Sequence, residues 1–448
     1  MALLLAAVAA GSSFAASAQQ QQPPPPDAIA PPPRVEMGPQ RRQVTLREAL
    51  QLTARQGPDI AAARAQAAIA QAQVKRAWTA WQPDIALNGT YDHSFTPASF
   101  NAGPALGDVT VIAPNTRQGT FQVSQPLFTP QGLFLPGIAN ANAEAAERNA
   151  DETREQILLS TSRTYLSLQG LEGLLAAARE LEKVALRREQ DARARVAAGT
   201  EVEIALLRAQ TETAAARAQI ANRQGQKENL LPLLEALTGE PIEPVTARVF
   251  ELPRMGDEGA QPWENAYSVR SAVAAAKAAS KSVNYDQWLW LPSVSGAFRE
   301  GYNSTGGFAE QNWTSDLIVS INIPLYDRGV RYAQLAEDRA RLNQAQAVLA
   351  SARARARSNW YGARANLTAT AAVVQQAATA NQLATRTQSQ VEASYRAGVA
   401  TSLDLTTADQ VRFDAQSTEA QARAELEIRK AELAAAEGRL YELSQLAQ

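Results

Sequence analysis

The residue types that carry most enzyme chemistry are scarce in this sequence. The 448-residue chain contains no cysteine and a single histidine, His93. These counts exclude thiol chemistry, disulfides, zinc sites built from cysteine and histidine, and a serine nucleophile activated by a placed imidazole. Phosphate-binding glycine loops and the GxSxG nucleophile motif are also absent from the sequence.

Carboxylates are the remaining candidates for chemistry, because a close pair can act as general acid and base. The 45 acidic residues are instead scattered over helix-forming segments, where most are solvated or join weak i,i+4 pairs. Together with 43 basic residues they give a net charge of −2, so no basic field favours nucleic acid. We therefore expect no catalytic residues, no cofactor, no metal and no nucleic-acid partner, in a protein that is not an enzyme.

Two glycine turns between long helix-forming runs organise the chain. Gly398 lies within Tyr395–Leu405, and Gly199 lies within Arg195–Ile204. Each follows an alanine-rich run and precedes a new apolar pattern, which is typical of a left-handed residue between two helices. Fixed spacings relate the halves: 199 residues separate Gly199 from Gly398 and Gly239 from Gly438, and 198 separate Pro126 from Pro324. The spacing predicts two tandem repeats, at residues 44–240 and 262–448, joined by a linker at 241–261.

Each repeat contains a segment in which apolar and polar residues alternate. The alternation predicts antiparallel hairpins at residues 84–125 and 293–323. The polar side chains of these strands include Asn88, Thr90, Gln122, Ser124 and Asn322. A sheet of a soluble protein would alternate in the same way. Strands of ~10 residues, aromatics at their ends and no apolar run of ~18 residues favour strands that cross a bilayer.

Four strands cannot close a barrel, because the smallest natural transmembrane barrels have ~8. An open edge in lipid would leave backbone groups unpaired, so the chain must oligomerise. Two copies would give eight strands filled by side chains, and three would give twelve strands with room for a lumen lined by the polar faces.

Long helices account for most of the remaining sequence. The runs between prolines and glycines predict helices at residues 139–198, 201–237, 330–397 and 402–446, with shorter ones at 45–81 and 262–290. Thr45 and Glu48 form a capping-box pattern at the first of these starts. The longest helices would measure ~90 to ~100 Å and carry apolar residues on more than one face, as helices of a wall do. An antiparallel coiled coil is the alternative.

The N-terminal residues indicate export. Residues 1–18 combine an apolar run with Ala16-Ser17-Ala18, the small-x-small pattern of a signal peptide. No cysteine follows, so we expect no lipid anchor. Residues 19–43 are rich in proline and glutamine and predict a disordered tether.

Taken together, the order of these elements resembles the TolC-type outer-membrane efflux protein family, also called outer membrane factors, over nearly all of the mature chain. Several motifs carry the resemblance: Trp81-Gln82-Pro83, Trp290-Leu291-Pro292, Pro126-Leu127-Phe128, Pro324-Leu325-Tyr326, Leu237-Thr238-Gly239 and the turn Tyr395–Asp404.

The resemblance implies a mainly α fold with a membrane β-barrel. In this fold a homotrimer forms a 12-stranded barrel in outer-membrane lipid of a Gram-negative bacterium, continued by an α-helical barrel through the periplasm. It implies a passive exit duct of a tripartite efflux or type I secretion system, docked on a periplasmic adaptor and an inner-membrane pump of RND or ABC type. The alternative is an exported coiled-coil or adhesin protein without a channel.

The resemblance also assigns the turns. Tyr395, Thr401 and Asp404 match the periplasmic gate, with Asp404 in a threefold ring that attracts cations. The adaptor-contact loops match Ala198, Gly199, Thr200, Ala397, Gly398 and Val399. Two positions depart from the family: Ala400 replaces a gating arginine and Ala205 an aspartate. The family's gate salt bridges therefore do not carry over residue by residue, and Glu201 and Glu203 are the acidic groups nearby.

Overall fold

The computed structural model describes residues 41–101, 108–245, 261–305 and 311–445. The expected signal peptide, residues 19–40 of the expected tether, residues 246–260 of the linker and the last residue of the helix expected at 402–446 lie outside this description.

A short strand and two helices open the described part. β1 (Arg42–Val44) leads into α1 (Leu46–Gln56), which has the capping box: the Thr45 hydroxyl accepts from the Glu48 N–H, and the Glu48 carboxylate accepts from the Thr45 N–H. α2 (Pro58–Trp78) and the 3-10 helix η1 (Thr79–Trp81) follow. Gly57 separates α1 from α2, where a Cβ would lie 2.5 Å from the Thr53 carbonyl oxygen.

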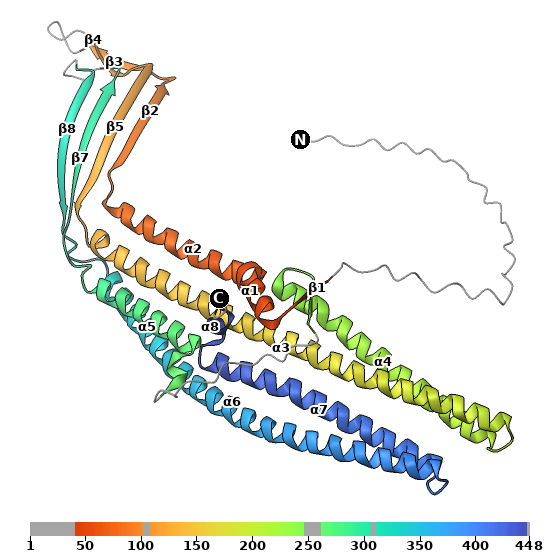
Figure 1. Ribbon diagram of the computed structural model, residues 1–448. Coiled ribbons are helices and arrows are strands. Elements are labelled where there is room, and N and C mark those ends of the chain that lie inside the picture. Colours follow the sequence, from red (N-terminus) through yellow and green to blue (C-terminus); the bar gives the residue numbers. More distant parts are fainter. Residues whose placement is uncertain (1–40, 102–107, 246–260, 306–310, 446–448) are drawn as a thin grey trace, which may run out of the picture. The chain divides into compact units, whose positions relative to one another are not determined.

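Four strands form one antiparallel sheet in the order β2–β5–β7–β8 (Figure 1). Their bounds are Asp84–His93 for β2, Asn115–Phe128 for β5, Ser293–Asn303 for β7 and Trp313–Asn322 for β8. A separate antiparallel pair, β3 (Ala98–Asn101) and β4 (Asp108–Ile112), lies between β2 and β5 in the chain. The pairing of β5 with β7 joins the two repeats in one sheet.

The first hairpin extends further than the range 84–125 expected from the sequence. β5 continues through Pro126 to Phe128, with a register shift between these two residues. A bulge tolerates proline because the missing N–H removes no regular ladder bond there.

The register gives the sheet one apolar face and one polar face, because directly paired residues of antiparallel strands share a face. Val123 pairs with Ile85 and Phe298, and Phe298 pairs with Leu317, so an apolar row crosses all four strands. Gln122 pairs with Ala86 and Arg299 on the opposite face. Glu300 interrupts the apolar face, and its carboxylate accepts a 2.6 Å hydrogen bond from the Ser315 hydroxyl.

Two long helices and their shorter neighbours form most of the remaining described residues. The helices are α3 (Pro130–Ala197), α4 (Glu203–Thr238), α5 (Tyr267–Asp286), α6 (Val330–Arg396), α7 (Ser402–Ala436) and α8 (Leu440–Gln445), with the 3-10 helix η2 (Pro262–Asn265) before α5. α3 packs against α2, α4, α5 and α7, and α6 packs against α5 and α7 (Figure 1). None of the described helices combines the length and hydropathy of a membrane-spanning helix.

The expectation that the first long helix starts at residue 139 is wrong. Thr129 caps α3 by accepting a 3.0 Å hydrogen bond from the Gly132 N–H, and Pro130 occupies the first helical position. Pro136 lies inside the helix and cannot donate to the Gly132 carbonyl four residues earlier. The Trp81 indole N–H donates to that carbonyl instead, at 2.6 Å, which allows the helix to pass through the proline.

The helix expected at 402–446 is also broken. α7 ends at Ala436, and Gly438 adopts a φ of 68° before α8. The buried carboxylate of Glu155 on α3 accepts the backbone N–H groups of Leu440 (2.9 Å) and Tyr441 (3.2 Å). These bonds satisfy the first backbone N–H groups of α8, so a separate helix begins here instead of a continuation of α7.

The main hydrophobic core lies where the two repeats meet. Its buried residues include Val44, Leu50, Leu158, Tyr165, Leu166, Leu168, Leu234, Ile242, Ala431, Ala434 and Leu440, and we call this cluster the junction core. β6 (Ile242–Pro244) pairs in parallel with β1 beside it. The expectation of a disordered tether up to residue 43 is therefore wrong for residues 42–43, which belong to β1, and the expected linker begins with the strand β6. Val44 and Ile242 are fully buried and hold this pair in the core.

Candidate functional site at the helical turns

The turns that follow the two long helices have the same backbone. Gly199 has a φ of 71° and Gly398 a φ of 74°, both in the left-handed region. The N–H of Thr200 donates to the Arg195 carbonyl, and the turn at Gly398 has the matching bond from Val399. A Cβ at either glycine would meet nothing within 4 Å, so the backbone conformation alone requires glycine.

Thr401 and Asp404 form a capping box at the start of α7. The Asp404 carboxylate accepts the Thr401 N–H at 2.8 Å and the Thr401 hydroxyl at 2.7 Å, and the Asp404 N–H donates to that hydroxyl. The side-chain bond from Thr401, followed by its backbone bond, lowers the pKa of Asp404 below its usual range. Val202 at the start of α4 makes no side-chain cap, so the second turn is the better fixed of the two.

Tyr395 connects the two turns. The guanidinium of Arg195, at the end of α3, donates to the Tyr395 hydroxyl at 3.4 Å. It also lies 5.4 Å from the centroid of the Tyr395 ring. This contact holds the first and second repeats together at their ends.

A half-buried arginine links three helices, two helical turns away from the glycine turns. Arg188 of α3 forms an ion pair with Asp409 of α7 and lies 3.9 Å from a carboxylate oxygen of Glu212 on α4. The Thr406 hydroxyl of α7 donates to Glu212 at 2.9 Å. Asp409 is 7 % exposed, so loss of Arg188 would leave a buried carboxylate without its cation.

These contacts border a cavity of about 560 Å³ between the α3–α4 and α6–α7 pairs, which we call the tip cavity. Its lining is highly charged and includes Arg187, Arg188, Arg195, Arg208, Arg396 and Arg412 with Glu180, Asp191, Glu201, Glu212 and Glu392. Dense charge of both signs suits a protein-docking or gating surface better than an apolar ligand.

The residues expected at the site lie in three places. The adaptor-contact residues Ala198, Gly199, Thr200, Ala397, Gly398 and Val399 are all exposed at the turns. Tyr395 meets Arg195, and Thr401 meets Asp404, so one protomer places the gate residues in two separate interactions. Glu201 borders the tip cavity.

Sequence reasoning missed Arg188, Asp409 and Glu212. A signal was present, because Arg188 follows Ala178, Leu181 and Ala185 at spacings of 3, 4 and 3 residues, which places it on one stripe of the helix with these apolar residues. A charge on such a stripe requires a partner on the facing helix. The partner itself could not be named without the packing of α3 against α7.

Comparisons with known proteins agree with this architecture. The family model of the outer membrane efflux protein matches residues 49–240 and 261–439. The chain is similar in structure to VceC of Vibrio cholerae, with a TM-score of 0.72, 19% identity and coverage of 88% of this chain and 96% of VceC. The CmeC outer membrane channel of Campylobacter jejuni matches with a TM-score of 0.73 and 15% identity, over 88% of this chain and 85% of CmeC. The open state of the MtrE outer membrane channel of Neisseria gonorrhoeae matches with a TM-score of 0.71 and 17% identity, over 88% of each chain.

A comparison with curated proteins finds no match. The structural similarities, all below 25% identity, support the fold. The family match covers both repeats and most of the chain, including both turns, so this chain belongs to the outer membrane efflux protein family.

Proposed function

We propose that the chain forms the exit duct of a tripartite efflux or type I secretion system. Three copies close a 12-stranded barrel in the outer membrane, and their helices continue it as a tunnel through the periplasm. A periplasmic adaptor and an inner-membrane pump deliver the substrate and supply the energy, while the duct itself conducts passively.

The uncovered edges of the four-stranded sheet are the observation that carries this proposal. β2 and β8 are the outer strands, and all ten residues of β8 are exposed. In lipid, each unpaired backbone group along these edges would cost several kcal/mol. Pairing of β8 with β2 of the next copy removes the edges, and three copies leave room for a lumen.

The two faces of the sheet fit a barrel wall. Leu87, Leu317 and Val319 belong to the apolar face and are 79%, 81% and 62% exposed in the single chain. Lipid is the environment that suits such residues. The opposite face, with Asn88 and Gln122, would line a water-filled lumen.

Aromatic residues gather near both ends of the strands. Trp288 and Trp290 precede β7 and are exposed. At the other end of the strands, the ring centroids of Tyr302 on β7 and Trp313 on β8 are 5.1 Å apart. Aromatic girdles of this kind mark the two interfaces of a membrane.

The alternative of a coiled-coil or adhesin protein predicts that the hairpins pack on their own helices. Apart from contacts with η1, the four strands make no extensive contact with the described helices, and their apolar face stays exposed. This observation disfavours the alternative.

The turns supply the gate and the adaptor surface in this proposal. Tyr395, Thr401 and Asp404 narrow the entrance, and the two exposed loops at Gly199 and Gly398 meet the adaptor. Arg188 replaces the missing family salt bridges, because it holds α3 and α4 against α7 within each protomer.

Recordings in planar lipid bilayers test the proposal. We expect the purified protein to insert and conduct weakly, and Arg188→Ala to raise the conductance by releasing α7. Arg217→Ala is the matched control, because its 3.0 Å pair with Glu182 joins α4 only to α3. Failure of the wild-type protein to form any conducting pore contradicts the proposal. If Arg188→Ala and Arg217→Ala change the conductance equally, the role of Arg188 is contradicted but the duct is not.

A further inference from the structure

The register of the sheet places an arginine on its apolar face. Every second residue of β5, counted back from Val123, lies on this face, which leads through Phe121 and Gly119 to Arg117. Arg117 pairs with Tyr91 of β2 and is exposed. Among the described residues of β2, β5, β7 and β8, it is the only lysine or arginine on the apolar face.

Arg117 lies near the end of the sheet that is remote from the helices. The strands join the helical part at their other end, through Asp84, Phe128, Ser293 and Asn322 (Figure 1). Tyr302 pairs with both Gly119 and Trp313, so these two aromatic residues share one row of the apolar face. Arg117 is two residues beyond Gly119 on β5, so it lies just outside the aromatic row.

Hydrogen bonds on both sides fix the backbone of Arg117. Its N–H donates to the Ser304 hydroxyl, and its carbonyl accepts from the Ser304 N–H, both at 2.9 Å. On the other side it is paired with Tyr91 in the β2–β5 ladder. The point from which the guanidinium extends is therefore well defined.

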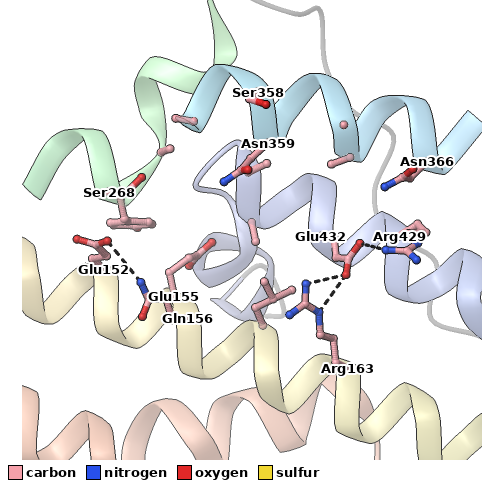
Figure 2. Close-up of a pocket in the computed structure, with 18 residues that line it drawn as sticks. Glu152, Glu155, Gln156, Arg163, Ser268, Ser358, Asn359, Asn366, Arg429 and Glu432 are labelled. Carbon is pink, nitrogen blue, oxygen red and sulfur yellow. Dashed lines mark hydrogen bonds and ion pairs between the residues drawn. The ribbon is translucent and has the colours of Figure 1, made fainter. Parts of the chain in front are cut away.

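The guanidinium itself has no anionic partner among the described residues. Other arginines do have one: Arg163 and Arg429 donate to Glu432 at 2.6 to 3.0 Å (Figure 2). Arg117 therefore offers a free positive charge on an otherwise apolar wall.

Polar groups surround this charge on the same face. The Tyr91 hydroxyl donates to the side-chain oxygen of Asn115 at 2.8 Å, and the His93 Nδ1 lies 2.8 Å from that oxygen. On the side toward the helices, Gly89 pairs with Gly119, so neither strand has a side chain between Arg117 and the apolar row at Phe121. Arg117 and Phe121 are four residues, roughly 13 Å, apart along β5.

The next step rests on the proposed duct. In that arrangement the apolar face meets lipid and the helices lie in the periplasm, so the end with Arg117 reaches the outer leaflet. Aromatic rows mark the boundary between acyl chains and headgroups, and a guanidinium just outside such a row lies at the level of the headgroups. Phosphate is the headgroup anion that a planar guanidinium binds best, through two parallel hydrogen bonds.

We propose that Arg117, Tyr91 and Asn115 form a binding site on the outer wall of the barrel for the phosphorylated glucosamine headgroup of an outer-leaflet glycolipid. The guanidinium binds the phosphate, and the polar groups beside it bind hydroxyl groups of the sugar. The apolar row at Phe121 contacts the acyl chains. A trimer carries three such sites.

Native mass spectrometry of the detergent-solubilised full-length protein, titrated with diphosphoryl lipid A, tests the site. We expect up to three bound molecules per trimer, and about a tenfold weaker affinity in Arg117→Gln, because a charge-assisted hydrogen bond is lost. Arg299→Gln is the matched control, since Arg299 lies on the opposite face, paired with Asp316. Its affinity should equal that of the wild type.

Two further probes use the wild-type protein alone and so do not depend on the folding of a variant. Dephosphorylated lipid A keeps the sugar and the acyl chains, and phosphatidylglycerol keeps a phosphate without the sugar. Both should bind at least tenfold more weakly than diphosphoryl lipid A. Equal binding of dephosphorylated lipid A would overturn the phosphate contact, and equal binding of phosphatidylglycerol would overturn the choice of a glycolipid.

Equal affinities of Arg117→Gln and wild type for diphosphoryl lipid A would overturn the assignment to Arg117. The duct stands in that case if the same preparation conducts in planar bilayers. Phosphate-dependent binding that needs Arg117, in a protein that does not conduct, would refute the duct while supporting the lipid site.

Discussion

At Gly438, between α7 and α8, the structure predicts the effect of adding one Cβ atom. Gly438 has a φ of 68°, and a Cβ at this position would lie 2.5 Å from the Asn265 carbonyl oxygen and 3.2 Å from the Asn265 carbonyl carbon. Gly398 has a similar φ of 74° but nothing within 4 Å of the added atom. Alanine at these two positions therefore separates backbone strain from steric overlap.

The left-handed conformation alone costs an alanine roughly 1 to 2 kcal/mol. Gly398→Ala should therefore lower the free energy of unfolding by about that amount. Gly438→Ala must also displace the backbone of Asn265, which adds about 1 to 3 kcal/mol as in other overpacked sites. The difference between the two variants should correspond to a change of about fivefold to about 160-fold in the local opening equilibrium.

Hydrogen–deuterium exchange of the detergent-solubilised protein measures both effects. Peptides that cover α8 should exchange faster in Gly438→Ala, because Leu440 anchors α8 in the junction core. In Gly398→Ala the faster exchange should stay within the turn. Equal protection of α8 in the two variants would refute the assigned packing of Gly438 against Asn265.

Three further predictions concern groups whose roles the structure defines. Trp81→Phe should destabilise the protein by about 1 to 3 kcal/mol, because the Gly132 carbonyl loses its donor; adding Pro136→Ala should restore part of that loss by returning a backbone N–H, as followed by thermal unfolding. Burial raises the pKa of Glu155 from its ordinary 4.5 to about 7, so its contribution to stability is full below pH 4.5 and is lost as the pH rises to 7, about 3 kcal/mol in all. Glu155→Gln should remove this slope from unfolding curves measured across that range, and an unchanged slope would contradict the assignment. Asp404→Asn should reduce cation selectivity in bilayer recordings while keeping an acceptor for the Thr401 N–H; unchanged selectivity would exclude the proposed ring of carboxylates.

The periodic elements of this fold could be predicted from sequence because each has a local cause. Alternation over residues 84–93 gave β2, and the glycine turns at Gly199 and Gly398 follow from left-handed caps. The start of α3 was not predictable from local signals, because Pro136 normally ends or excludes a helix. A tryptophan 51 residues away in the chain satisfies the carbonyl that this proline leaves free.

The candidate site was predictable only where the backbone carries it. Residues that are neighbours in the sequence determine the exposed turns and the Thr401–Asp404 capping box. The Arg188–Asp409 pair joins residues more than 200 positions apart. This pair depends on tertiary packing, which no local pattern contains.

The detergent-corrected mass of the protein extracted from outer membranes tests the central claim most directly. Light scattering on a sizing column should give about three times the 48.1 kDa chain, less any leader removed on export. A trimer supplies the twelve strands that cover the edges at β2 and β8. A water-soluble monomer would contradict the barrel, and with it the duct.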